Sequence, residues 1–142
     1  MSEYRASASD QPLLIAAFNG RIFGLDPASG SIVWEFELPE GRFPVHIAVA
    51  DDRVFAAALD KLHCLDAKTG ARQWDTALAF QGVSEVRVMG HALLVVSNGE
   101  LECFSLTGEA LWQNGFVGKG WGVISLGGPL VQPLSGPPAS NR

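Results

Sequence analysis

Residues 64–74 read C-L-D-A-K-T-G-A-R-Q-W, and related sequences before and after them indicate the fold. Residues 24–34 read G-L-D-P-A-S-G-S-I-V-W, and residues 103–112 read C-F-S-L-T-G-E-A-L-W, one residue shorter in the turn. The tryptophans of these stretches lie 40 and 38 residues apart, and so do their glycines. Two markers with one period indicate three copies of a unit of roughly 40 residues. The markers are Trp34, Trp74, Trp112, Gly30, Gly70 and Gly108.

Each unit has the pattern of β-structure. Short runs rich in Val, Ile, Leu and Phe are cut by turn pairs such as N-G, and none is long enough for an amphipathic helix. Residues 123–126 and 130–131 resemble the opening of a fourth unit. The expected strands are 13–17, 21–26 and 32–37, with a weak polar candidate at 5–9; then 45–49, 54–58, 62–66 and 72–77; then 86–89, 93–97, 101–106 and 110–114.

Four strands in about 40 residues is the spacing of β-propeller blades, with a solenoid as the main alternative. We therefore predict an all-β chain of three four-stranded blades and a partial fourth. The partial propeller spans residues 1–132, and 133–142 form a disordered tail rich in Pro, Ser and Gly. The predicted blades are about 5–38, 43–78 and 84–117, with the partial one at 122–132.

The repeated D-x-x-S/T-G stretch is predicted to be a tight turn. Asp accepts backbone N–H groups within such a turn, and Gly takes a positive φ at low cost. Ca²⁺ binding is the functional alternative, but one carboxylate per turn falls short of the roughly six to eight oxygens that this ion takes. Each Trp follows its Gly by four residues, on the outermost strand of a blade. Its indole is expected to wedge between neighbouring sheets, opposite a small residue.

The pattern small-x-Asp-x-x-Thr-Gly-x-x-x-Trp resembles the tryptophan-docking repeat of the PQQ-type (quinoprotein-like) β-propellers, in three rounds over about residues 13–126. The small residue of that family is usually Ala, whereas here it is Gly24, Cys64 and Cys103. We interpret both cysteines as small apolar fillers under an indole. Equivalent positions on adjacent blades lie about 10 Å apart, too far for a disulfide, so both thiols should be free and buried.

The resemblance also implies an alternative function, a PQQ-dependent dehydrogenase-like enzyme or a fragment of one, with PQQ and calcium as cofactors. The repeat reports blade packing rather than cofactor binding, and the sequence has no vicinal cysteine pair or carboxylate cluster. His46, His63 and His91 lack metal-ligand spacing, and no G-x-S-x-G, P-loop or Rossmann pattern occurs. We predict no catalytic residues, no metal and no cofactor, and favour a non-catalytic scaffold or binding module.

The loops that lead from one blade to the next are the candidate binding surface, because such loops line one end of a propeller's channel. By repeat alignment Trp121 matches Phe43, and Lys119 lies in the glycine-rich run G-K-G-W-G. The candidate residues for a ligand or partner are Phe43, His46, Lys119 and Trp121. The alternative interpretation is that Phe43 and Trp121 plug the channel or pack between chains.

Charge and composition limit the partners. The formal net charge of −5 disfavours nucleic acid and anionic membranes. No apolar run approaches the roughly 20 residues of a membrane span. The polar start M-S-E-Y-R-A-S-A-S-D has no apolar segment of a signal peptide, so a cytoplasmic location is expected.

Three blades are too few for a ring, since propellers close with about four to eight. Open end blades would expose apolar sheet faces. We therefore predict a homodimer that completes a six-bladed ring, with residues 123–126 supplying a strand to the partner's first blade. Seven or eight blades, or a different protein supplying the missing blades, are the alternatives.

Overall fold

The computed structural model describes residues 11–132, which form three antiparallel β-sheets and no helix. The first sheet has three strands in the order β1-β2-β3, and the other two have four. The strands are β1 (Leu14–Phe18), β2 (Arg21–Leu25), β3 (Ile32–Glu37), β4 (His46–Ala50), β5 (Arg53–Ala58), β6 (Lys61–Asp66), β7 (Arg72–Ala77), β8 (Glu85–Met89), β9 (Ala92–Ser97), β10 (Glu100–Ser105) and β11 (Ala110–Asn114).

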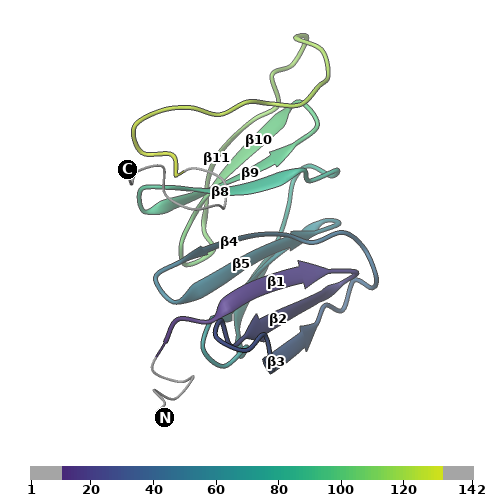
Figure 1. Cartoon of the computed structure of the whole chain (residues 1–142). Helices are drawn as coiled ribbons and strands as arrows, with labels where there is room; N and C mark the ends of the chain where they lie inside the picture. Colours follow the sequence, from purple (N-terminus) through teal and green to yellow (C-terminus); the bar gives the residue numbers. More distant parts are fainter. Residues whose placement is uncertain (1–10, 133–142) are drawn as a thin grey trace.

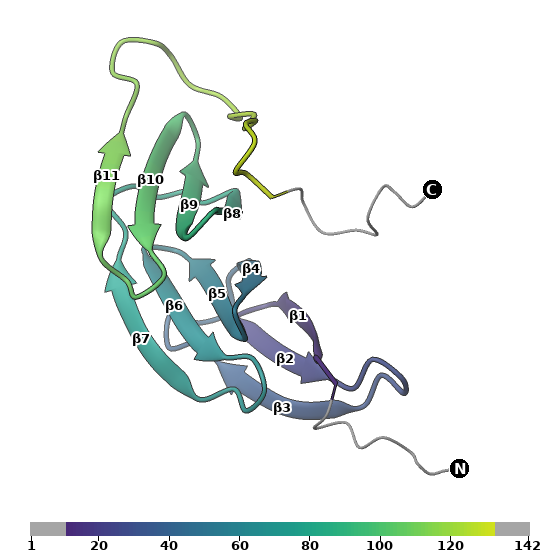
Figure 2. The ribbon, with the colours of Figure 1, turned by 90° about the vertical axis from the view of Figure 1, so that its left-hand side faces the viewer.

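The sheets are stacked face to face along an arc (Figure 1). Figure 2 shows the first strand of each sheet, β1, β4 and β8, on the concave side and the last, β3, β7 and β11, on the convex side. Each sheet is thus one blade, and we name the sheets blade 1, blade 2 and blade 3 in chain order. The arrangement is that of consecutive blades in a β-propeller, so the predicted fold class is confirmed. Eleven strands were predicted for the three units within residues 11–132, and the structure contains all eleven, with each end within one residue of its predicted position.

Two apolar cores lie between the blades. Between blades 1 and 2, Ile22, Trp34 and Leu38 pack against Ala56 and Ala58 of β5 and against Leu65. Between blades 2 and 3, Phe55 and Leu62 pack against Phe104 and the valines of β8. Blade 2 has a covered sheet on both sides, which explains why the central residues of β5 and β6 are buried throughout.

The repeated turns adopt the predicted geometry. Gly30 and Gly70 both have φ of +78°, and their N–H groups donate to the carbonyls of Asp26 and Asp66. The carboxylate of Asp66 also accepts the N–H of Lys68 at 2.8 Å. The one-residue-shorter third turn keeps the same closure, because the Gly108 N–H donates to the Ser105 carbonyl.

The sequence also predicts strands at 123–126 and at 5–9. The expected strand at 123–126 was wrong, because these residues form no strand and instead lie over blade 3, where Ile124 and Leu126 pack on its outer face. Val131 forms a single antiparallel bridge to Met89 of β8. The polar candidate at 5–9 lies outside the described residues.

Candidate binding site on the loop face

The tryptophans set the distance between blades, and therefore the position of every loop. The indole of Trp34 is only 8% exposed, and its Nε1 donates to the Ala67 carbonyl of blade 2 at 2.9 Å. A Cβ on Gly24 would lie 2.2 Å from that Nε1, and one on Gly70 would lie 2.5 Å from the other edge of the ring. Glycine is required at both positions because the indole is clamped between them. The predicted wedge is confirmed for this residue.

Trp74 makes the equivalent contact with blade 3, where a Cβ on Gly108 would lie 2.9 Å from its ring. Its Nε1 is buried without a partner in the described structure. The turn of blade 3 offers the Leu106 carbonyl, but Arg53 donates to it at 2.8 Å. The shortened turn thus keeps the packing of the wedge and loses its hydrogen bond.

The cysteines serve the same packing. Cys64 stands opposite Trp74 and Cys103 opposite Trp112 in the strand register, and both thiols are free and buried, as predicted. Burial raises the pKa of the Cys64 thiol to about 11 and raises the pKa of Cys103. Thiols with raised pKa values carry little thiolate near neutral pH and are weak nucleophiles. The chemistry supports a filling role for both.

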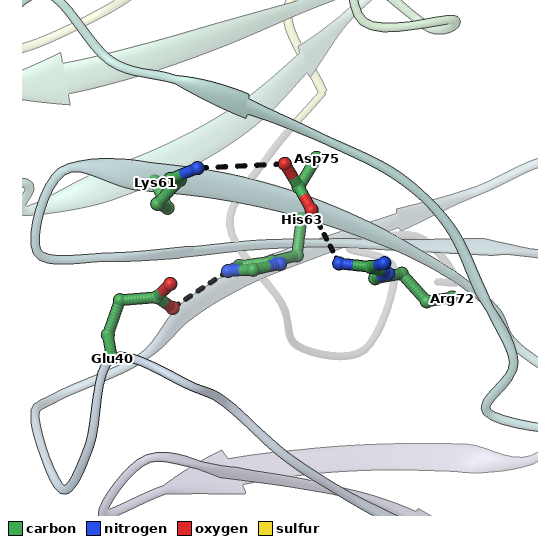
Figure 3. Close-up of polar contacts among 5 residues, drawn as sticks. All are labelled: Glu40, Lys61, His63, Arg72 and Asp75. Carbon is green, nitrogen blue, oxygen red and sulfur yellow. Dashed lines mark hydrogen bonds and ion pairs between the residues drawn. The ribbon is translucent and has the colours of Figure 1, made fainter.

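Two buried polar side chains anchor the loops that connect the blades. Nε2 of His63, a residue that is itself buried, donates to Oε1 of Glu40 in the loop after β3, at 2.7 Å (Figure 3). Glu102 occupies the repeat position of His63 in blade 3, and its carboxylate accepts the N–H groups of Ala79 and Phe80 in the loop after β7. Each loop is therefore held at its base by the following blade.

Figure 3 also shows Asp75 on β7, across the sheet from His63. Its carboxylate accepts from Arg72 at 2.7 Å and lies 3.7 Å from Nζ of Lys61. These pairs are partly exposed and contribute little to stability. The pattern is that of a solvated edge beside the buried His63–Glu40 pair, not of a catalytic constellation.

We use the term loop face for the side formed by loops 38–45, 78–84 and 115–122 together with the hairpin turns 19–20, 59–60 and 98–99. Hydrogen bonds between backbone groups connect these loops to the hairpin turns. The Gly20 N–H donates to the Phe43 carbonyl at 2.9 Å, and the Leu78 N–H donates to the Asp60 carbonyl, also at 2.9 Å. The loop face is thus a continuous surface held by the hairpins beneath it.

A cavity of about 210 Å³ opens on this face. Phe43 and His46, two of the four residues predicted from the sequence, line it together. Burial lowers the pKa of His46, with the nearby Glu85 carboxylate acting in the opposite direction, so the imidazole is neutral at pH 7. His46 is the one ionisable group in an otherwise apolar wall. The remaining lining residues are Pro44, Ala58, Leu59, Gly82 and Val83.

The other two predicted residues lie elsewhere. Trp121 is 82% exposed, and its backbone lies over the hairpin turn of blade 3, close to Gly99. Lys119 is exposed in the same loop. Neither lines the cavity of Phe43 and His46. Their role in binding stays a prediction.

Leu59 is a prominent residue of this cavity that was not predicted from the sequence. It occupies the turn between β5 and β6, where blades 1 and 3 have Asn19 and Asn98. Its φ is +52°, a conformation that costs a leucine energy and that asparagine tolerates. The side chain is nevertheless 43% exposed. An alignment of the three hairpin turns could have identified Leu59, because it is the one position of the three without asparagine.

A second, wider cavity of about 440 Å³ lies on the concave side, along the inner strands. Its walls are mostly apolar and include Ile15, Ala48 and Val86, and Arg87 is its one charged residue. The Arg87 guanidinium is occupied by Glu85 and by the Gln132 carbonyl. The cavity therefore offers no free charge to a ligand.

Comparison with known proteins agrees with the geometry. The three stacked blades, with Trp34 and Trp74 docked between them, define the chain as part of a β-propeller. A family model described as "Outer membrane protein assembly factor BamB" matches residues 18–133, and the chain belongs to this family of PQQ-like repeat proteins. No curated protein matched.

Three solved structures are similar in fold. BamB from Moraxella catarrhalis is 23% identical, with a TM-score of 0.61 over 72% of this chain and 32% of that one. A europium-containing methanol dehydrogenase is 20% identical, with a TM-score of 0.54 over 71% of this chain and 22% of that one. The quinohemoprotein alcohol dehydrogenase from Comamonas testosteroni is 20% identical, with a TM-score of 0.58 over 72% and 19%. The chain thus spans a third or less of each protein.

Dehydrogenases among these structures raise the question of a quinone site. The resemblance described above implies PQQ with calcium, an ion that takes about six to eight oxygen ligands. Residues 11–132 contain no group of three or more His, Cys, Asp or Glu placed to hold a metal ion. This part of the chain therefore offers no ready set of carboxylate ligands for calcium. It also contains no helix able to cross a membrane.

Proposed function

We propose that the protein is a non-catalytic β-propeller binding module, and that the cavity on its loop face takes an apolar or aromatic side chain of a partner protein. The cavity has room for one such side chain. Its wall is apolar apart from His46, whose neutral imidazole can pair with a backbone group of the partner.

The observation that carries this proposal is Leu59. A bulky apolar residue is held with φ of +52° and 43% exposed, where the two sister turns have asparagine. The backbone conformation costs about 1 kcal/mol relative to asparagine, and the exposed part of the leucine side chain adds nothing to the stability of the fold. A residue that is unfavourable in both respects favours a role outside folding, namely contact with a bound partner.

The substitution Leu59→Asn tests the proposal, because it should separate binding from stability. Peptides selected from a random displayed library by the wild-type protein should carry an apolar or aromatic anchor. Leu59→Asn should weaken their binding by about tenfold or more, while the protein stays as stable as wild type or becomes more stable. Val49→Asn is the matched control, since Val49 is 45% exposed and lies outside this cavity.

Two results contradict the proposal. One is that no peptides are enriched over an unrelated protein. The other is that Leu59→Asn and Phe43→Ala bind the selected peptides as wild type does. The enzyme alternative is tested separately by supplying PQQ with calcium: a quinone absorbance band that stays with the protein through gel filtration favours a dehydrogenase.

A further inference from the structure

The two ends of the blade stack expose apolar surface, and this surface lies outside the loop-face cavity of Phe43 and His46. On the outer side of blade 1, Phe18 is 64% exposed and stacks with Phe23 at a centroid distance of 5.7 Å. On the outer side of blade 3, Trp112 is 46% exposed, and Phe116 is also exposed. We name these surfaces the first end face and the second end face.

The two interfaces inside the chain show what each end face lacks. Trp34 docks on the Gly70 turn of the next blade, and Trp74 docks on the Gly108 turn. Leu38 and Leu78, four residues after each indole, are buried in the same interfaces. Trp112 and Phe116 are the third pair of this series, and no blade within residues 11–132 covers them.

The missing half of the contact is present at the other end. The turn of Gly30 has no atom within 4 Å of the position of a Cβ, whereas Gly70 and Gly108 are each covered by an indole. The turn D-P-A-S-G at residues 26–30 has the full length of the turn that receives Trp34, and Gly30 has the same φ as Gly70. Pro27 of this turn occupies the repeat position of Ala67, whose carbonyl accepts the indole N–H of Trp34.

We propose that a second copy of this chain covers both end faces, with Trp112 of each copy docked on the Gly30 turn of the other. The contact continues the two interfaces that the chain already makes with itself. Because each copy brings three blades, two copies give six, which lies within the four to eight or so blades of closed propellers, whereas three copies exceed that range. A pair related by a two-fold axis satisfies both end faces at once.

The C-terminal segment must move when the copies meet. Ile124, Leu126 and Val131 now pack on Leu94 and Val96, on the inner half of the second end face. β1 has no partner on its inner edge among the described residues, whereas its counterparts β5 and β9 are paired there with β4 and β8. Residues 123–127 follow β8 by the interval that separates Trp74 from Trp112, so they occupy the repeat position of the strand that β1 lacks. Their natural destination is the β1 edge of the second copy.

The experiment is light scattering on the full chain at several protein concentrations, with variants of each end face. Wild type should show twice the chain mass of 15.1 kDa. Trp112→Glu and Phe18→Glu should each raise the dissociation constant of the dimer by about 30-fold or more, as expected for a central interface residue. Val49→Glu, equally exposed but on β4, should leave the dimer intact. Circular dichroism verifies that each variant is folded.

Mixing the two end-face variants tests the pairing itself. In a mixed dimer, one of the two interfaces joins two unchanged end faces. Trp112→Glu and Phe18→Glu chains should therefore form a one-to-one complex at a concentration at which each alone is a monomer. A monomeric wild type overturns the proposal. So does a Trp112→Glu variant that dimerises normally, a Phe18→Glu variant that dimerises while Trp112→Glu does not, or a mixture that stays monomeric. None of these outcomes depends on the loop-face cavity.

Discussion

Replacement of Trp34 by alanine should destabilise the fold more than any other single substitution at a blade interface. The indole is almost fully buried, sits between Gly24 and Gly70, and donates a buried hydrogen bond to the Ala67 carbonyl. Gly24 is paired in the β2–β3 ladder, and Gly70 is fixed in a hydrogen-bonded turn. The two blades therefore cannot close on the cavity that the missing indole leaves. A large-to-small change of this kind costs about 3–5 kcal/mol, from lost burial and the cavity together.

The assay is urea unfolding followed by circular dichroism, with wild type and variants at one protein concentration because association would add to stability. Trp34→Phe separates the two contributions, since it keeps much of the apolar contact and leaves the Ala67 carbonyl unpaired. We expect it to cost about 1–3 kcal/mol, less than the alanine variant. A loss below about 1 kcal/mol for Trp34→Ala would refute the wedge, and equal losses for both variants would refute the role of ring packing.

Three further predictions follow from buried groups. Cys64 and Cys103 should resist a thiol reagent in the native protein at pH 8 and react fully in denaturant, since burial raises the pKa of both; native reaction as fast as in denaturant contradicts this. Glu102→Ala should cost about 2–3 kcal/mol in urea unfolding by leaving two loop N–H groups without an acceptor, whereas the exposed Glu109→Ala should cost less than about 0.5 kcal/mol. Because burial lowers the pKa of His46 below its unfolded value of about 6.5, the unfolded chain takes the proton first as pH falls, so wild type should lose thermal stability between pH 7.5 and 5.5 more steeply than His46→Gln; parallel curves contradict the assignment.

The fold could be predicted from the sequence because its determinants are local and repeated. The turn glycines need positive φ, the indoles need a small residue opposite, and alternating apolar runs set the strands; all of these are visible within one unit. The error at 123–126 has a physical cause. A strand needs a neighbouring edge, and within this chain the segment finds only the outer face of blade 3, on which Ile124 and Leu126 pack. The sequence shows strand potential, whereas the available partner decides the outcome.

The candidate site could be predicted only in part. Repeat alignment placed Phe43 and His46 on one face, since loops at equivalent positions lie at the same end of a propeller, and in the structure both line one cavity there. It did not reveal that Leu59 and Val83 complete one cavity, because that depends on how far apart the blades are held by Trp34 and Trp74. The anchoring role of Glu102 was also missed, since it depends on two backbone N–H groups about 20 residues away in the chain.

A repeat protein carries its own reference for each position, and departures from the repeat therefore have physical meaning. Leu59 replaces the asparagines of the sister turns, Asn19 and Asn98, although its backbone conformation does not favour leucine, and the proposed binding role gives this choice a reason. Trp112 is the reverse case: the tryptophan of the repeat is kept, but its indole is 46% exposed, whereas that of Trp34 is buried against the next blade. The first departure supports the proposed partner on the loop face, and the second supports the proposed second copy beside blade 3. Because the two signals lie on different surfaces, a ring closed by a second copy would present the cavity of Leu59 twice, so a partner with two apolar anchors would gain avidity from the same assembly.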